Sequence, residues 1–202
     1  MHHRIPGWDP GFTPQDFVAL AGVTTGPVLL AGSPELCAEA SACKGEPAIA
    51  VGAADATDVT AAVRFAADFG LPLIVLSPGH EPSGSEDGGL LLTTSRMNRV
   101  YIDRRNRTAI AEAGALWSDV VRRAAEAGLA PLVPPYGDMS VVGPDYGWAA
   151  GHVEAIEYVT PDAQLRRVTP VSDRRLFAQL CGSDPAEPCI GVITEMTFVL
   201  FR

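Results

Sequence analysis

The sequence has few basic residues and almost no lysine. Only 15 of its 202 residues are Lys or Arg, against 24 Asp or Glu, and Lys44 is the single lysine. The net charge of -9 and the isoelectric point near 4.8 oppose binding to a polyphosphate backbone or to an anionic membrane surface. We therefore expect no nucleic-acid partner and no membrane partner.

Cysteines and long apolar runs are also scarce. Four cysteines are too few for a disulfide scaffold of this size, and none has the Cys-x-x-Cys spacing of a structural zinc site, so we expect no metal. The first residues lack the apolar core of a secretory signal, and no apolar run approaches the length of a membrane span. These absences predict a soluble, cytoplasmic protein.

The sequence lacks the short motifs of several common enzyme classes. It has no Walker sequence and no Gly-x-Gly-x-x-Gly between a strand and a helix. It also has no Gly-x-Ser-x-Gly turn of the kind that carries a nucleophilic serine. P-loop nucleotide hydrolysis, Rossmann-type cofactor binding and α/β-hydrolase chemistry are therefore not indicated.

What is present is the pattern of a globular α+β domain. The composition is 47% hydrophobic and 19% charged, which is typical of a chain that buries a core. Residues 48–51 and 73–76 are predicted strands. Between them, a helix begins at a capping Asp55 or Thr57 and ends near Phe69. This order predicts a βαβ unit with parallel strands.

After residue 88 the pattern changes to short strands separated by polar turns, which favours antiparallel pairing. We expect one domain over residues 1–202, made of two lobes at about 12–95 and 96–202, with a ligand site at their seam. The further predicted elements are strands at 28–30, 90–92, 100–102, 108–111 and 190–201, a hairpin at 153–169, and helices at 33–43, 116–127 and 174–180. The helix at 116–127 should turn Val120, Val121, Ala124 and Ala125 inward.

Several stretches of the sequence, in order, resemble one enzyme family. They are Gly26–Leu30, Ala53–Leu73, Asp87–Leu90, Ser95–Met97, Arg107–Ala109, Gly114–Trp117 and Gly191–Thr194. Together they resemble the FAD-binding domain of the para-cresol methylhydroxylase/vanillyl-alcohol oxidase (PCMH-type) superfamily, close to its berberine-bridge-enzyme branch. The resemblance covers residues 17–201. It implies a two-lobed α+β fold with FAD between the lobes and, because the chain stops at Arg202, an absent substrate domain.

The first cofactor-binding loop departs from the family pattern. The family has a run of glycines before a histidine and an arginine before the glycines, whereas here the loop reads Leu76-Ser77-Pro78-Gly79-His80-Glu81. Pro78 has no N–H to donate, and Glu81 would place a carboxylate beside a diphosphate. His80 stands where the family often carries the histidine that is covalently linked to the flavin.

The other two cofactor loops differ as well. Residues 140–143 fit the family, but residues 144–151 replace a longer glycine-rich passage. Residues 181–189 carry two carboxylates and two prolines in place of amide donors. If FAD is bound, the resemblance assigns it to Gly79, His80, Val142, Gly143, Gly191 and Val192.

These departures lead to a first hypothesis and two alternatives. The first is a domain without cofactor that catalyses a cyclisation, isomerisation or elimination of a small organic substrate in a specialised biosynthetic pathway. Its candidate acid/base residues are His80, Glu81, Tyr136, Asp138, Asp145 and Tyr146. For His80 a solvated loop position is an equal alternative, and for the carboxylates it is the commoner one.

The alternatives are an FAD-dependent oxidoreductase with its flavin linked at His80, and a non-catalytic interaction module. The face that the absent domain would cover predicts a homo-oligomer, most simply a dimer.

Overall fold

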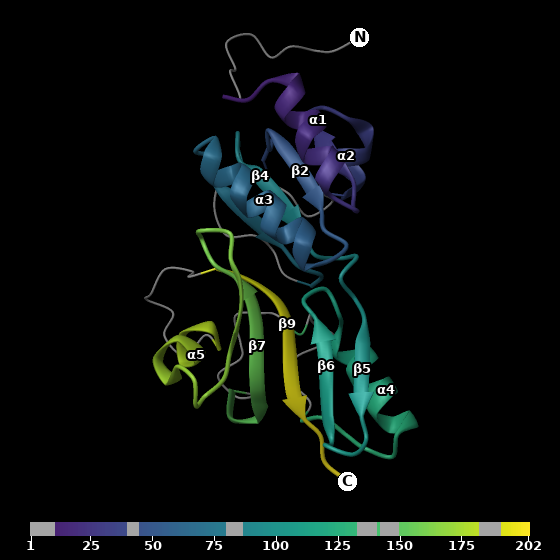
Figure 1. The fold of residues 1–202 in the computed structure, drawn as a ribbon. Helices are drawn as coiled ribbons and strands as arrows, with labels where there is room; N and C mark the ends of the chain where they lie inside the picture. The colour runs from purple at the N-terminus through teal and green to yellow at the C-terminus, as the bar shows by residue number, and fades with distance from the viewer. Residues whose placement is uncertain (1–10, 40–44, 80–86, 133–140, 142–149, 182–190) are drawn as a thin grey trace.

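The computed structural model describes residues 11–39, 45–79, 87–132, 141, 150–181 and 191–202. These residues form two β-sheets with helices packed against them, and the first sheet lies above the second in Figure 1. The strand order is β1-β2-β4-β3 in the first sheet and β5-β6-β9-β7-β8 in the second. The predicted α+β fold, with a parallel unit followed by an antiparallel sheet, is confirmed.

The central parallel strand of the first sheet is β4. Strand β4 lies between β2 and β3 and is parallel to both. The prediction that residues 90–92 belong to the antiparallel region was therefore wrong. The three leucines of β4 are fully buried, as expected for a central strand with both faces covered. The strands of this sheet are β1 (Val28–Leu30), β2 (Ile49–Gly52), β3 (Leu73–Leu76) and β4 (Leu90–Thr93).

Helix α3 (Ala56–Asp68) covers one face of the first sheet. Asp55 is its N-cap and accepts hydrogen bonds from the N–H groups of Thr57 and Asp58, so the predicted start is confirmed for Asp55. Gly70, with a φ of 63°, follows its end. Helix α1 (Pro14–Val23) packs beside α3, and Leu36 of the short α2 (Pro34–Glu39) contacts the opposite face.

The buried carboxylate of Asp58 stabilises the turn after the carboxyl end of β2 by hydrogen bonds to the backbone. Asp58 is 0% exposed and accepts three backbone hydrogen bonds, from Thr25 at 2.7 Å, Gly26 at 2.9 Å and Ala54 at 2.9 Å. The backbone of Gly26 lies so close to Gly52 that a Cβ would be 1.9 Å from the Gly52 carbonyl oxygen. The segment before β1 and the turn between β2 and α3 are therefore held by one side chain.

All strand pairs in the second sheet are antiparallel. Helix α4 (Trp117–Glu126) and helix α5 (Arg174–Leu180) share a core with it, in which the Trp117 and Phe198 rings are 4.9 Å apart. Val120 and Ala124 are buried, but Ala125 is exposed, so its predicted inward position was wrong. The helix contacts the sheet along a narrow i, i+3, i+7 stripe that begins at Trp117. The strands are β5 (Val100–Asp103), β6 (Thr108–Glu112), β7 (Val153–Val159), β8 (Leu165–Val168) and β9 (Val192–Val199).

The two sheets also share part of a core. Val159 and Val192, at adjoining ends of β7 and β9, belong to the same buried cluster as Val59 and Val63 of α3. Apolar contacts therefore hold one side of the junction between the sheets. Within the part of the chain that the structure describes, no helix is long and apolar enough to cross a membrane.

We predict that Asp58→Ala lowers the free energy of unfolding by about 3 kcal/mol or more, because three backbone N–H groups lose the buried carboxylate that accepts their hydrogen bonds. Urea denaturation followed by circular dichroism would measure the change. Asp55→Ala is the control, because it removes an ordinary helix cap from the same turn and should cost about 1 kcal/mol. Equal losses for the two variants would contradict a special role for Asp58.

Candidate functional site

The parallel strands β2, β3 and β4 end at the edge of the first sheet that faces the second sheet (Figure 1). Ligands of open sheets with parallel strands bind outside the carboxyl ends of those strands. The residues that follow the three strands here are Ala53, Ser77 and Thr94. This edge is the candidate site.

Two buried hydroxyl groups lie at the ends of the neighbouring strands β3 and β4. The Ser77 Oγ and Thr94 Oγ1 atoms are 3.1 Å apart, and both residues are buried. A hydroxyl can donate one hydrogen bond and accept others, so the pair suits sugar or phosphate oxygens. Two residues further on, Gly79 has a φ of 78°, which favours glycine.

The backbones of the two sheets touch at Gly114. A Cβ on this residue would lie 2.0 Å from the Thr94 carbonyl oxygen and 3.0 Å from that of Met97. The Gly114 N–H donates to the Met97 carbonyl at 2.8 Å, and the Met97 N–H donates to the Thr94 carbonyl at 2.8 Å. The turn after β4 is therefore packed directly against the segment after β6.

Gly191 and Val192 begin the central strand of the second sheet. Gly191 has a φ of 155°, and a Cβ there would lie 2.4 Å from the Val159 carbonyl oxygen. Val192 is 5% exposed and packs in the core that α3 shares. The backbone conformation and the lack of room for a Cβ therefore require glycine at position 191, and Val192 packs at the junction between the sheets.

Most of the site residues that the sequence predicted lie outside the described residues. They are His80, Glu81, Tyr136, Asp138, Val142, Gly143, Asp145 and Tyr146. Three described neighbours of these segments lie at the junction. Gly79 follows β3, the Val141 N–H donates to the Ala115 carbonyl at 2.8 Å, and Gly191 precedes β9. A described residue next to each of these three segments therefore lies near the junction between the two sheets.

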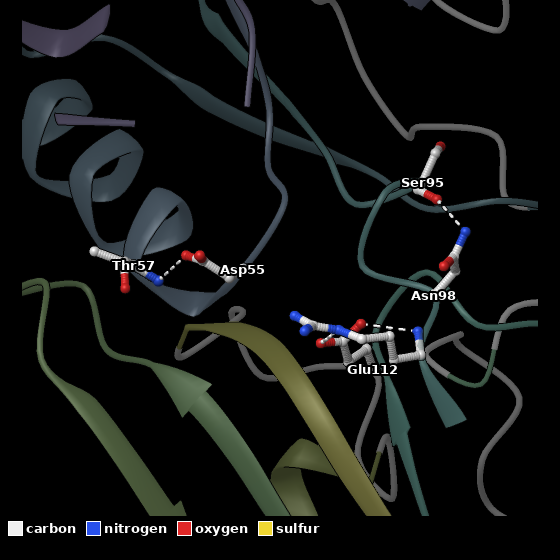
Figure 2. A network of polar contacts seen from close by, with 6 residues as sticks. Asp55, Thr57, Ser95, Asn98 and Glu112 are labelled. Atoms are coloured by element: carbon white, nitrogen blue, oxygen red, sulfur yellow. Dashed lines mark hydrogen bonds and ion pairs between the residues drawn. The ribbon is translucent and has the colours of Figure 1, made fainter. Parts of the chain in front are cut away.

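A carboxylate of the second sheet holds the turn after β4. Glu112 Oε2 accepts the Arg99 N–H at 2.8 Å, and Glu112 Oε1 accepts the Arg99 Nε–H at 2.9 Å. Figure 2 shows Glu112 below Ser95 and Asn98, with Asp55 and Thr57 at the start of α3. The sequence did not single out Glu112.

Glu112 is one end of a row of three carboxylates across neighbouring strands. It stands opposite Glu195, which stands opposite Glu157. Burial raises the pKa of Glu195, and the Glu157 and Glu112 carboxylates raise it further, against Arg167 at 3.7 Å. The sequence could not reveal this row, because only the strand pairing makes these glutamates neighbours.

Two further observations concern thiol and metal-binding groups among the described residues. Burial raises the pKa of the free Cys181 thiol to about 11, so it remains protonated near neutral pH and is a poor nucleophile. In the described ranges, no group of three or more His, Cys, Asp or Glu side chains is placed to hold a metal ion.

We predict that Glu195→Gln stabilises the protein at pH 7 by up to about 1 kcal/mol, because it removes a like charge between two carboxylates. The folded-state pKa of Glu195 is raised, so its stabilising contribution is present below the unfolded-state pKa of about 4.3 and is lost as the pH rises through the folded-state value. The advantage of the variant should therefore shrink toward pH 4.

Urea denaturation at pH 4, 5.5 and 7 would measure this trend. Glu154→Gln, at an exposed position of the same sheet, should change the stability little at any of these values. A loss of stability in Glu195→Gln at pH 7 would contradict the prediction.

Comparisons with known proteins agree on one family. A family model described as an FAD binding domain matches residues 47–169. The (R)-6-hydroxynicotine oxidase of Paenarthrobacter nicotinovorans is 30% identical over 169 residues, which cover 77% of this chain and 36% of that protein. The chain thus spans little more than a third of the length of this relative.

Solved structures give the same answer for the fold. The structure of 6-hydroxy-D-nicotine oxidase from Arthrobacter nicotinovorans has a TM-score of 0.77 at 26% identity, covering 89% of this chain and 43% of that one. The berberine-bridge-like protein 1 of Physcomitrella patens has a TM-score of 0.77 at 13% identity, covering 92% and 44%, and shows the fold alone. The chain therefore belongs to the FAD-binding domain family of PCMH-type oxidases and berberine-bridge-like enzymes.

Proposed function

We propose that this chain is the cofactor-binding part of an FAD-dependent oxidoreductase, with the dinucleotide between the two sheets. The observation that carries the proposal is the junction itself. Three parallel strands end there, and the Gly114 backbone lies against Thr94 without room for a Cβ. Ligand sites of this kind depend on close backbone approach and on groups at strand ends.

The described residues at the junction fit a dinucleotide in their chemistry. The Ser77 and Thr94 hydroxyls would hydrogen-bond to ribose or phosphate oxygens, and the left-handed Gly79 lets the chain turn close to the cofactor. When bound, FAD supplies the capacity to accept a hydride from an organic substrate. His80, which lies outside the described residues, is our proposed point of covalent attachment.

The substrate side of the reaction is a further proposal. The chain spans 36% of the hydroxynicotine oxidase that it resembles, so residues beyond this part of the fold would complete the active site. That relative is named for the oxidation of a small organic molecule, and we propose a small organic substrate here too.

A second function remains favoured by specific residues of the first loop. Pro78 offers no N–H, and Glu81 would bring a carboxylate near the diphosphate. These residues support a domain that binds a small organic substrate in place of FAD and rearranges it by cyclisation, isomerisation or elimination. In that case His80, Tyr136 or Tyr146 would move the proton. The dimeric state and the cytoplasmic location both stay predictions.

The first prediction concerns the visible absorption spectrum of the purified protein after soaking with FAD. An FAD-dependent protein should retain the flavin bands after gel filtration, and a covalent link should keep them with the protein after acid precipitation. His80→Ala should then lose only the acid-stable fraction. A colourless protein that takes up no FAD would overturn the proposed function and favour the second candidate.

The second prediction tests whether the altered loop limits cofactor affinity. Pro78→Gly combined with Glu81→Ser restores one N–H donor and removes one negative charge. Each change is worth about 1 kcal/mol in a contact with phosphate, so the Kd for FAD should fall by about tenfold or more. Fluorescence titration with FAD would measure it. An unchanged Kd would contradict the idea that these two residues weaken binding.

A further inference from the structure

We propose that Glu112 is a positioning residue for the cofactor: from the second sheet, it fixes the turn at residues 94–99 that forms one wall of the dinucleotide site. The inference rests on the proposed function and adds a residue to it. Glu112 itself need not touch the cofactor, because it acts through Arg99 and the turn.

The turn occupies a central place at the junction. It follows β4, which lies between β2 and β3, and it connects the first sheet to β5 in the second sheet. Its first residue, Thr94, carries one of the two buried hydroxyls and donates its N–H to the Leu76 carbonyl at 3.0 Å. A shift of this turn would therefore move the Thr94 hydroxyl that is paired with Ser77 at the strand ends.

Glu112 binds the far end of the turn by three hydrogen bonds to a single residue. Its carboxylate accepts the N–H and the Nε–H of Arg99, and its own N–H donates to the Arg99 carbonyl at 3.0 Å. The Glu112 side chain is 16% exposed, whereas that of Arg99 is 74% exposed. The glutamate is thus the fixed partner, and the arginine is the residue that it holds.

The turn is also blocked on its inner side. Gly114 already touches the carbonyl oxygens of Thr94 and Met97, so the turn has no room to move toward β6. The bonds to Glu112 oppose movement in the other direction. Because Pro78 removes an N–H from the neighbouring loop, the cofactor would depend more on the groups that this turn presents.

The negative charge of Glu112 destabilises the sheet, and the strand pairing does not require a charge at this position. Glu112 stands directly opposite Glu195, and like charges at such positions destabilise a sheet. A glutamine would fill the same space without the repulsion. Sequence choices that break a local rule are expected at functional sites, where another requirement outweighs them. Here that requirement is the pair of charge-assisted hydrogen bonds that Arg99 donates to the Glu112 carboxylate.

The experiment compares Glu112→Gln and Glu112→Ala with Glu195→Gln in the full chain. Glu195→Gln is the matched control, because it removes a carboxylate from the same row without touching the turn. Fluorescence titration with FAD gives the Kd, hydrogen exchange of the Arg99 amide reports the turn, and urea denaturation gives the stability.

We expect the Kd for FAD to rise by about tenfold in Glu112→Gln and further in Glu112→Ala, with faster exchange at Arg99. Glu195→Gln should keep its Kd within about twofold of the wild type. A purely structural role would instead make the Kd follow the stability. Weaker FAD binding in Glu112→Gln without a loss of stability therefore supports positioning.

The proposal is overturned if Glu112→Ala exchanges the Arg99 amide faster yet binds FAD as tightly as the wild type. It is also overturned if Glu112→Gln and Glu195→Gln weaken binding equally. If Glu112→Ala does not fold, the Glu112→Gln result decides. Wild-type protein that takes up no FAD would overturn the proposed function together with this role, and that failure is evident before any variant is compared.

Discussion

The backbone of Gly114 lies against the carbonyl oxygen of Thr94, and the way in which the two sheets meet depends on this contact. A Cβ would be 2.0 Å from that oxygen, so a larger residue would force the sheets apart. On the other side of the junction, Val159 and Val192 pack with α3. The carboxyl ends of the parallel strands are thereby held near the start of β9.

The carboxylates of this acidic chain fall into two kinds. Asp58 is fully buried, but three backbone N–H groups satisfy it, so its burial strengthens the turn that it fastens. Glu195 is half-buried between two other glutamates and lies 3.7 Å from the Arg167 guanidinium. The burial of Asp58 stabilises the fold. The row of three glutamates destabilises it, so the row needs another explanation. We attribute the row to the hydrogen bonds by which Glu112 fixes Arg99 and the turn at residues 94–99.

This chain keeps the framework glycines of the fold but differs from the family pattern in its first cofactor loop. Glycines are present where the backbone requires them, at Gly79 because of its positive φ and at Gly114 and Gly191 because of close backbone contacts. The first cofactor loop of the resemblance nonetheless contains Pro78 and Glu81, which suit a diphosphate poorly. A retained framework supports FAD binding, and the altered loop supports a changed ligand. Both proposed functions would place their ligand at the junction between the sheets, so the choice between them depends on the chemistry of the loops.

The sequence by itself determined the local elements and the family. Helix α3 is capped by Asp55 and followed by Gly70, and both features could be predicted because capping and chain reversal involve only neighbouring residues. The family could be inferred from short motifs that occur in the family's order along the chain. The seam was predicted from the change between a parallel and an antiparallel strand pattern. Only the tertiary structure placed β4 between β2 and β3, left Ala125 exposed, and aligned Glu112 with Glu195 and Glu157. Strand order and register are contacts between distant segments, and a local pattern does not encode which segments will meet.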